Sequence, residues 1–178
     1  VVSLAEGVFN SLSERNIVSW NAMIASYVQS GSGREAIQLF NEMQGQGMVP
    51  NKVTFVEVYP ACCTLQKGIL LHTHFLHGGF VVDDVVASSI ISMYGKCSNV
   101  EDSRKVFDNM PHRDLISWSS MMGVYAQDSK GKEVIKLFTE MKEEVDPNKV
   151  IFVSVVDACT DSKMLTAGKV VHCCAVLD

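Results

Sequence analysis

Apolar side chains recur along the chain at the three- and four-residue spacing of an amphipathic helix, and short polar or glycine-containing breaks separate the stretches that carry them. Trp20, Met23 and Tyr27 have this spacing in the segment 17–30, and the next segment, 33–43, shows it again. The pattern therefore predicts helices in pairs, with a tight turn inside each pair. We expect almost no strand.

The chain repeats itself at two periods. The segment 17–30, IVSWNAMIASYVQS, returns 98 residues later as LISWSSMMGVYAQD, and GREAIQLFNEM at 33–43 returns at the same offset as GKEVIKLFTEM. NKVTFVEVYPAC, which begins at Asn51, returns 97 residues later from Asn148. A shorter period lies inside the long one, because the spacing Tyr-x12-Phe-x2-Met occurs three times. Such short periods are typical of repeat arrays.

The repeats divide the chain into one partial unit and five further units: 1–16, 17–51, 52–83, 84–114, 115–148 and 149–178. A single helical hairpin cannot bury both of its apolar stripes, whereas stacked hairpins share one continuous core. The predicted fold is therefore all-α, a right-handed α-solenoid (superhelix) of stacked helix-turn-helix repeats. Because the first and last units are incomplete, we interpret the chain as a fragment of a longer array.

Local sequence sets the expected boundaries of the helices. The β-branched segment KVTFVEVY at 52–59 has strand propensity, but its place in the repeat predicts a first helix. An Asn or Asp stands just before each predicted first helix, where its side chain can cap the helix: Asn16, Asn51, Asp84, Asp114 and Asn148.

Composition narrows the class of protein. Of 178 residues, 47% are hydrophobic, which is enough for a sizeable core, and no apolar run reaches the roughly 20 residues that span a bilayer. The six cysteines have no metal-ligand spacing, and we predict free thiols. The net charge of −5 argues against a protein that binds nucleic acid mainly through phosphate contacts.

The chain fits part of the tetratricopeptide pattern, but Ile24 and Met122 stand where that pattern has glycine. It instead resembles the pentatricopeptide repeat family in its plant organellar PLS form, through phrases such as VSWNAMI, EAIQLFNEM, SMYGKC, VEDSRKVFDNMPHRD and ISWSSMM. The resemblance covers essentially the whole chain. It assigns 17–51 and 115–148 as P-type, 52–83 and 149–178 as L-type, and 84–114 and the partial 1–16 as S-type.

The resemblance implies sequence-selective binding of single-stranded RNA, with one base read per repeat by two or three side chains. The residues implied in base recognition are Asn21, Asn51, Ser88, Asp114, Ser119 and Asn148. The residues implied as apolar wedges that stack on bases are Val18, Val85 and Ile116.

The spacing is compatible with this role, because Val18 and Asn21 are three apart and share a helix face. Two alternatives remain at this stage: the unit-final Asn and Asp residues can serve only as helix caps, and the wedge residues can be buried between hairpins. Asn21 favours RNA recognition, since it stands among apolar residues with no evident local partner.

The family's code predicts a pyrimidine, cytidine first, for Asn21 with Asn51, guanosine for Ser88 with Asp114, and adenosine for Ser119 with Asn148. We call the place of Asn21, Ser88 and Ser119 in their units the head position. The L-type units carry Val56 and Val153 there, and valine offers no hydrogen bond to a base. The expected footprint is 5′-C/U-N-G-A-3′, parallel to the chain.

No catalytic chemistry is expected. The H-x-E and P-C-x-x-C motifs of a zinc deaminase are absent, and His72 and His74 lie on different helix faces. We therefore expect no metal, no cofactor and no enzyme activity in this segment, but a role in guiding C-to-U RNA editing or processing.

The expected location is the mitochondrion or the plastid, with the mitochondrion favoured, and no membrane partner is expected. Editing-factor proteins are possible partners of the L-type units. The rival function is a protein-interaction scaffold of tetratricopeptide-like repeats. A scaffold of that kind predicts a basic, carboxylate-binding clamp on the first helices, and the sequence shows no Lys/Arg cluster there.

Overall fold

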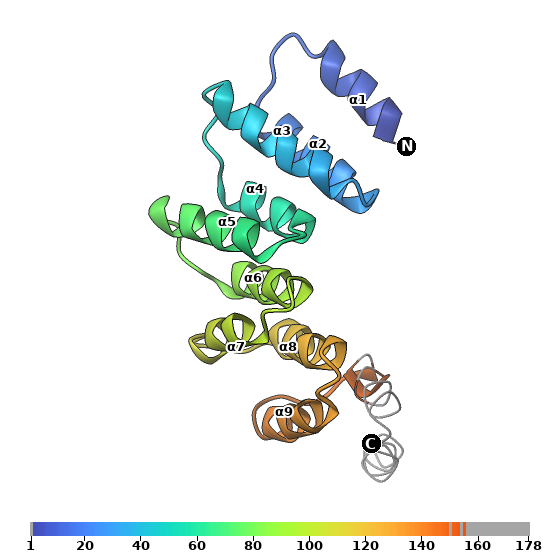
Figure 1. Cartoon of the computed structure of the whole chain (residues 1–178), viewed down its shortest axis with the longest axis vertical. Helices are drawn as coiled ribbons and strands as arrows, with labels where there is room; N and C mark the ends of the chain where they lie inside the picture. Colours follow the sequence, from blue (N-terminus) through green and yellow to red (C-terminus); the bar gives the residue numbers. More distant parts are fainter. Residues whose placement is uncertain (1, 150, 154, 156–178) are drawn as a thin grey trace. The chain divides into compact units, whose positions relative to one another are not determined.

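A computed structural model describes residues 2–149, 151–153 and 155 of the chain, and all regular structure in this part is helical (Figure 1). The chain divides into two compact units, Val1–Ser89 and Ile90–Asp178. The prediction of an all-α fold built from paired helices is confirmed for the described residues, and no strand occurs among them.

The first unit contains five α-helices, a short 3₁₀ helix and the start of a sixth α-helix. These are α1 (Val2–Ser11), α2 (Ile17–Gln29), α3 (Gly33–Gly45), α4 (Lys52–Val58), η1 (Tyr59–Ala61), α5 (Leu65–His77) and α6 (Asp84–Lys96), which continues into the second unit. The second unit then contains α7 (Val100–Asp108), α8 (Leu115–Gln127) and α9 (Gly131–Glu144).

Aromatic rings fill the core of the first unit. Phe55 on α4 lies fully buried between Phe40 on α3 and Phe75 on α5, with ring centroids 5.8 Å and 5.3 Å away in edge-to-face geometry. Such pairs add to the hydrophobic gain of burial. The β-branched segment around Phe55 is therefore a helix because its apolar stripe packs against two neighbouring helices.

Helix α1 is joined to α2 by a polar contact as well as by apolar ones. The Tyr27 hydroxyl donates to Glu6 Oε1 at 2.7 Å, and this hydrogen bond to a carboxylate, together with burial, raises the pKa of Tyr27 to about 12. Phe9 packs edge-to-face on Trp20 with ring centroids 4.9 Å apart.

The second compact unit is also held together by buried apolar and aromatic side chains. Trp118, Met121 and Phe138 are buried where α8 packs on α9. Helices α6 and α8 approach closely at Gly95, where an added Cβ would lie 2.3 Å from Val124 Cγ2. Glycine is therefore required at Gly95 by the neighbouring helix rather than by its own backbone angles.

The predicted caps are present with one correction. Asn16, Asn51 and Asp114 each accept a backbone N–H of the following helix, and Asn148 Oδ1 accepts from Ile151 N at 3.0 Å. The prediction that Asp84 precedes its helix is wrong. Asp83 occupies that place: its Oδ1 accepts from Val86 N, and its carbonyl accepts from Ala87 N, so α6 begins one residue earlier than expected.

Some expectations concern residues outside the described part of the chain. Most of the predicted unit 149–178 belongs to this class, including Cys159, Cys173 and Cys174. None of the three described cysteines, Cys62, Cys63 and Cys97, forms a disulfide bond, in agreement with the prediction of thiols.

Candidate nucleic-acid interface

The first turns of three helices share an exposed apolar residue. Val18 on α2, Val85 on α6 and Ile116 on α8 are 70%, 58% and 63% exposed. Apolar side chains with this much exposure contribute little hydrophobic free energy to the core, and a flat aromatic ligand can stack on them. The alternative in which these residues are buried between hairpins is therefore excluded.

The head and the unit-final residue of 17–51 lie in direct contact. Asn21 Nδ2 donates to Asn51 Oδ1 at 3.3 Å, and Thr54 Oγ1 donates to Asn21 Oδ1 at 2.7 Å. The cap formed by Asn51 thus also holds the side chain that the sequence assigns to base recognition. Because Asn51 caps α4 and lies 30 residues after Asn21 on α2, this contact is made only by the fold.

Asn21 has partners that the sequence did not indicate. Asn51 and Thr54, which lie 30 and 33 residues later in the chain, both bind its side chain. It is also buried, with 9% of its surface exposed, at the place where its amide hydrogen-bonds Asn51 and Thr54. Of Val18 and Asn21, which share one face of α2, Val18 is the exposed residue.

The other two predicted pairs are less complete. Ser88, a residue assigned to base recognition, is buried, and its Oγ has no hydrogen-bond partner among the described residues. Its predicted partner, Asp114, is exposed and belongs to the other compact unit. Ser119 is half-buried and Asn148 is exposed, and both belong to the second compact unit, 90–178.

The predicted unit 52–83 has a different arrangement at the corresponding place. Val56 is half-buried and offers no hydrogen bond, while Asp83 forms an ion pair with Lys52, the first residue of α4. The hydrogen bond from Lys52 lowers the pKa of Asp83 below its usual value. The carboxylate of this unit is therefore engaged within the protein. Val153, at the head position of 149–178, is 60% exposed.

Sequence reasoning missed a pair of arginines at the junctions between units. Arg15 lies over the Phe9 ring at 4.5 Å and near the Trp20 ring at 5.7 Å, and its Nε donates to the Phe9 carbonyl at 3.4 Å. The residues 98 positions later form the same arrangement, with Arg113 over Phe107 at 5.0 Å. The signal was present in the repeated Phe-x5-Arg-x4-Trp spacing.

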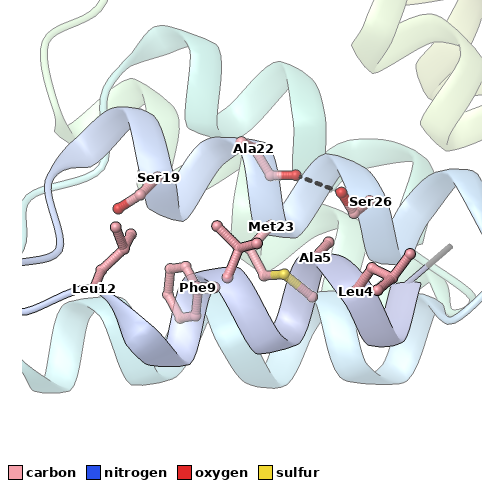
Figure 2. Close-up of a pocket in the computed structure, with 9 residues that line it drawn as sticks. Leu4, Ala5, Phe9, Leu12, Ser19, Ala22, Met23 and Ser26 are labelled. Carbon is pink, nitrogen blue, oxygen red and sulfur yellow. Dashed lines mark hydrogen bonds between the residues drawn. The ribbon is translucent and has the colours of Figure 1, made fainter.

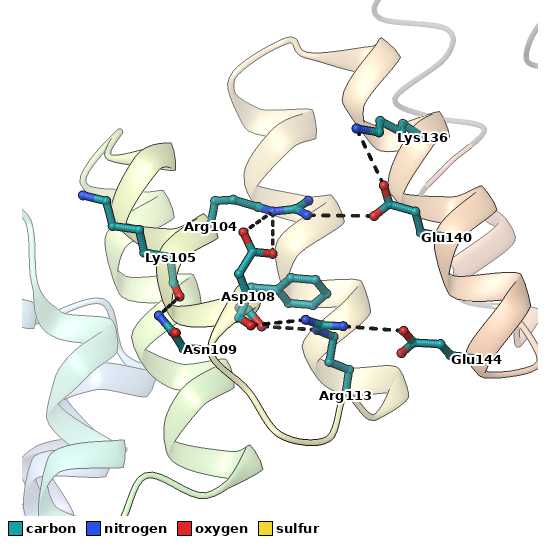
Figure 3. Close-up of polar contacts among 9 residues, drawn as sticks. Arg104, Lys105, Asp108, Asn109, Arg113, Lys136, Glu140 and Glu144 are labelled. Carbon is teal, nitrogen blue, oxygen red and sulfur yellow. Dashed lines mark hydrogen bonds and ion pairs between the residues drawn. The ribbon is translucent and has the colours of Figure 1, made fainter.

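The second copy of this arginine has an additional ionic partner (Figure 3). Arg113 Nη1 lies 3.5 Å from Glu144 Oε1, and Arg104 Nη2 lies 3.9 Å from Glu140 Oε2, so two ion pairs join α7 and its following loop to α9. Arg104 also binds Asp108 on its own helix at 2.8 Å. These contacts stabilise the hairpin junction and leave no free basic cluster on this face of α7.

The groove between α1 and α2 is lined by no charged side chain of the described residues (Figure 2). Its volume is about 490 Å³, and its lining is apolar except for two serines: Leu4, Ala5, Val8, Phe9, Leu12, Ser19, Ala22, Met23 and Ser26. A face of this kind is the sort that a neighbouring helix covers in a repeat array.

Two kinds of feature are absent from the described part of the chain. No group of three or more His, Cys, Asp or Glu side chains in it has the arrangement of a metal site. Among its helices, none combines the length and the apolar character that crossing a membrane requires.

Comparison with known proteins places the chain among repeat proteins. The model of the PPR repeat family matches residues 15–64, and the PPR repeat model matches 85–115 and 116–144. A putative pentatricopeptide repeat-containing protein of Arabidopsis thaliana is 41% identical over 88% of this chain and 22% of its own length. The chloroplastic Arabidopsis protein CRR2 is 38% identical over 94% of this chain and 26% of its own length.

The chain thus spans about a quarter of the length of these relatives. The names of related Arabidopsis proteins include both "chloroplastic" and "mitochondrial". Among solved structures, the repeat protein PPR10, in complex with an 18-nt psaJ RNA element, is similar with a TM-score of 0.79. It is 15% identical, over 92% of this chain and 26% of that one, so the likeness shows the solenoid fold of helical repeats. On the matching repeat models and the sequence relatives together, this chain belongs to the pentatricopeptide repeat family.

Proposed function

We propose that this segment binds single-stranded RNA in a sequence-selective way. The observation that carries the proposal is the joined pair Asn21–Asn51, with Val18 exposed one helical turn away. An apolar side chain that stacks on a base, beside amide groups that hydrogen-bond its edge, is the combination that reads unpaired RNA. The similarity to a repeat protein solved with RNA supports the same conclusion.

The proposed assignments follow the repeat units. Asn21 with Asn51 prefers cytidine, then uridine. Ser88 with Asp114 prefers guanosine, and Ser119 with Asn148 prefers adenosine. The L-type unit 52–83 is silent, because Val56 cannot hydrogen-bond and Asp83 is paired with Lys52. The footprint is 5′-C/U-N-G-A-3′ along the chain.

The biological role we propose is to guide organellar RNA editing or processing. The names of the relatives support an organelle, mitochondrion or plastid, as the location. The segment acts as a binding array, with the chemistry supplied elsewhere, and the L-type units remain candidate contacts for editing-factor proteins. The alternation of P-, L- and S-type units is part of this proposal.

The lack of basic side chains on α2 and α8 argues against the scaffold alternative. A helical array that captures acidic peptide ends needs cationic side chains on its first helices. Helices α2 and α8 carry no Lys or Arg, and their polar residues are Ser, Asn and Gln with one Tyr each. These groups suit hydrogen bonding to bases better than carboxylate capture.

The direct test is to change one head residue and follow one base. Ser119→Asn gives the second P-type unit the side-chain pair of the first, so the preferred base at its position should change from A to C or U. Four RNAs that differ only at this base are compared by fluorescence anisotropy. Ser120→Asn is the matched control, because residue 120 lies on another part of the same helix surface, and it should leave the preference at A.

The proposal fails if Ser119→Asn binds the four RNAs in the same order as the unchanged protein. It also fails if the unchanged protein does not distinguish the four RNAs at all.

A further inference from the structure

Thr54 is a fully buried hydroxyl residue at the junction of two hairpins. It stands three residues after Asn51 on α4, and its Oγ1 lies 2.7 Å from Asn21 Oδ1, 3.0 Å from Asn51 Oδ1 and 3.0 Å from the Asn51 backbone N. Both residues assigned to base recognition in this unit therefore contact the same hydroxyl group.

The number of protons at Thr54 limits what its hydroxyl group can do. A hydroxyl group has one proton to donate and lone pairs to accept. Oγ1 accepts the Asn51 backbone N–H, so its single proton goes to one of the two amide oxygens, and the shorter distance is to Asn21 Oδ1. Thr54 thus donates to Asn21 while it accepts from Asn51.

These contacts define which way the Asn21 amide points. Asn51 Oδ1 accepts the Thr54 backbone N–H at 3.0 Å, so it acts as an acceptor, and the Asn21 atom 3.3 Å from it is the Nδ2 donor. Asn21 Oδ1 then faces the Thr54 hydroxyl. The second N–H of Asn21 and the Nδ2 group of Asn51 make no hydrogen bond to the described residues. The groups of this pair that remain available to a ligand are therefore hydrogen-bond donors.

We propose that Thr54 is a positioning residue that sets the C-over-U preference of the unit 17–51, an inference that rests on the proposed RNA binding. The Thr54 hydroxyl holds the Asn21 amide with its oxygen inward and a donor outward. An outward donor complements cytosine, whose N3 accepts a hydrogen bond, and opposes uracil, whose N3–H donates one. Without the hydroxyl group the amide can rotate and offer its oxygen to uracil.

The corresponding place in the unit 149–178 shows that an asparagine cap forms without a hydroxyl group at this position. Ile151 stands there, 97 residues after Thr54, and it is buried. Asn148 still caps that helix through the Ile151 backbone N–H at 3.0 Å. The Thr54 hydroxyl completes a reciprocal capping box with Asn51 that Ile151 cannot form, and in addition it contacts Asn21.

The test compares Thr54→Val, which keeps the shape and removes the hydroxyl group, with Thr54→Ser, which keeps it. Binding is measured to two RNAs that have C or U at the position of this unit. Thr54→Val should lower the C-over-U affinity ratio by about fivefold, the effect of one hydrogen bond, and Thr54→Ser should keep the ratio.

Ser19→Val is the matched control for capping. Ser19 forms the same reciprocal cap with Asn16, at 3.1 Å and 3.0 Å, but contacts none of the recognition residues. It should weaken the start of its helix without a change in the C-over-U ratio. Thermal unfolding of all three variants by circular dichroism shows that each remains folded.

Hydrogen exchange of the Asn21 side-chain amide, read by NMR without RNA, separates the two proposals. Exchange should be faster in Thr54→Val than in Thr54→Ser. If Thr54→Val keeps the unchanged C-over-U ratio, or if Ser19→Val lowers the ratio equally, the role of Thr54 is refuted. If the unchanged protein binds neither RNA, RNA recognition itself fails, while the exchange data still report whether Thr54 orients the amide.

Discussion

At the scale of single residues, the junction arginines connect recognition to stability. Arg15 and Arg113 each lie over a Phe and near a Trp, and each donates to the carbonyl of that Phe near the end of a second helix. A guanidinium group suits this place because it is planar and can stack and donate together. The following first helix, which carries the wedge residue, is thereby held close to the helix before it.

Arg113→Lys keeps the charge but loses the planar contact, so it should lower the free energy of unfolding by about 1 kcal/mol. Chemical denaturation followed by circular dichroism measures this. Lys136→Ala removes an exposed ion pair with Glu140 on α9 and should change stability by less than about 0.5 kcal/mol. Equal effects of the two substitutions would show that stacking contributes nothing at Arg113.

At the scale of helices, close contact decides where a small residue is required. Gly95→Ala would ordinarily favour a helix, by up to about 1 kcal/mol. Here the new methyl group meets Val124 on α8, and the overpacked contact should instead destabilise the protein by about 1–3 kcal/mol. The double variant Gly95→Ala, Val124→Ala should recover much of this loss in a denaturation experiment. No recovery would mean that the contact is not the cause.

The start of α4 gives a pH-dependent prediction. Lys52 lowers the pKa of Asp83, so the pair stabilises the folded state above the ordinary pKa of an aspartate, and this contribution disappears as the pH falls through the lower, folded-state value. Lys52→Met should raise the pKa of Asp83 toward its ordinary range, as read by NMR titration of the carboxyl carbon. The stability difference between the two proteins should vanish in strong acid, and a difference that persists there would contradict the assignment.

At the scale of the whole molecule, the net charge of −5 limits how RNA can be bound. A protein that neutralises many phosphates loses affinity steeply with salt, whereas stacking and edge hydrogen bonds release few counterions. We expect affinity for a short single strand to fall by no more than about tenfold between about 50 and 200 mM salt. A much steeper fall, measured by anisotropy over this range, would show that phosphate contacts dominate.

Periodicity along the chain was sufficient for the helical hairpins, the repeat offset and the caps at Asn16, Asn51, Asp114 and Asn148, because these depend on neighbours within a turn or two of helix. The exposure of Val18, Val85 and Ile116 agrees with the family resemblance, while their role as wedges stays a prediction. Contacts between hairpins could not be read in the same way. The partners of Asn21, the pairing of Asp83 with Lys52 and the crowding at Gly95 each join residues about 30 apart. The burial of Ser88 is likewise a property of the folded chain. These features exist only when helices from successive hairpins pack together, because residues so far apart in sequence are not neighbours on one helix.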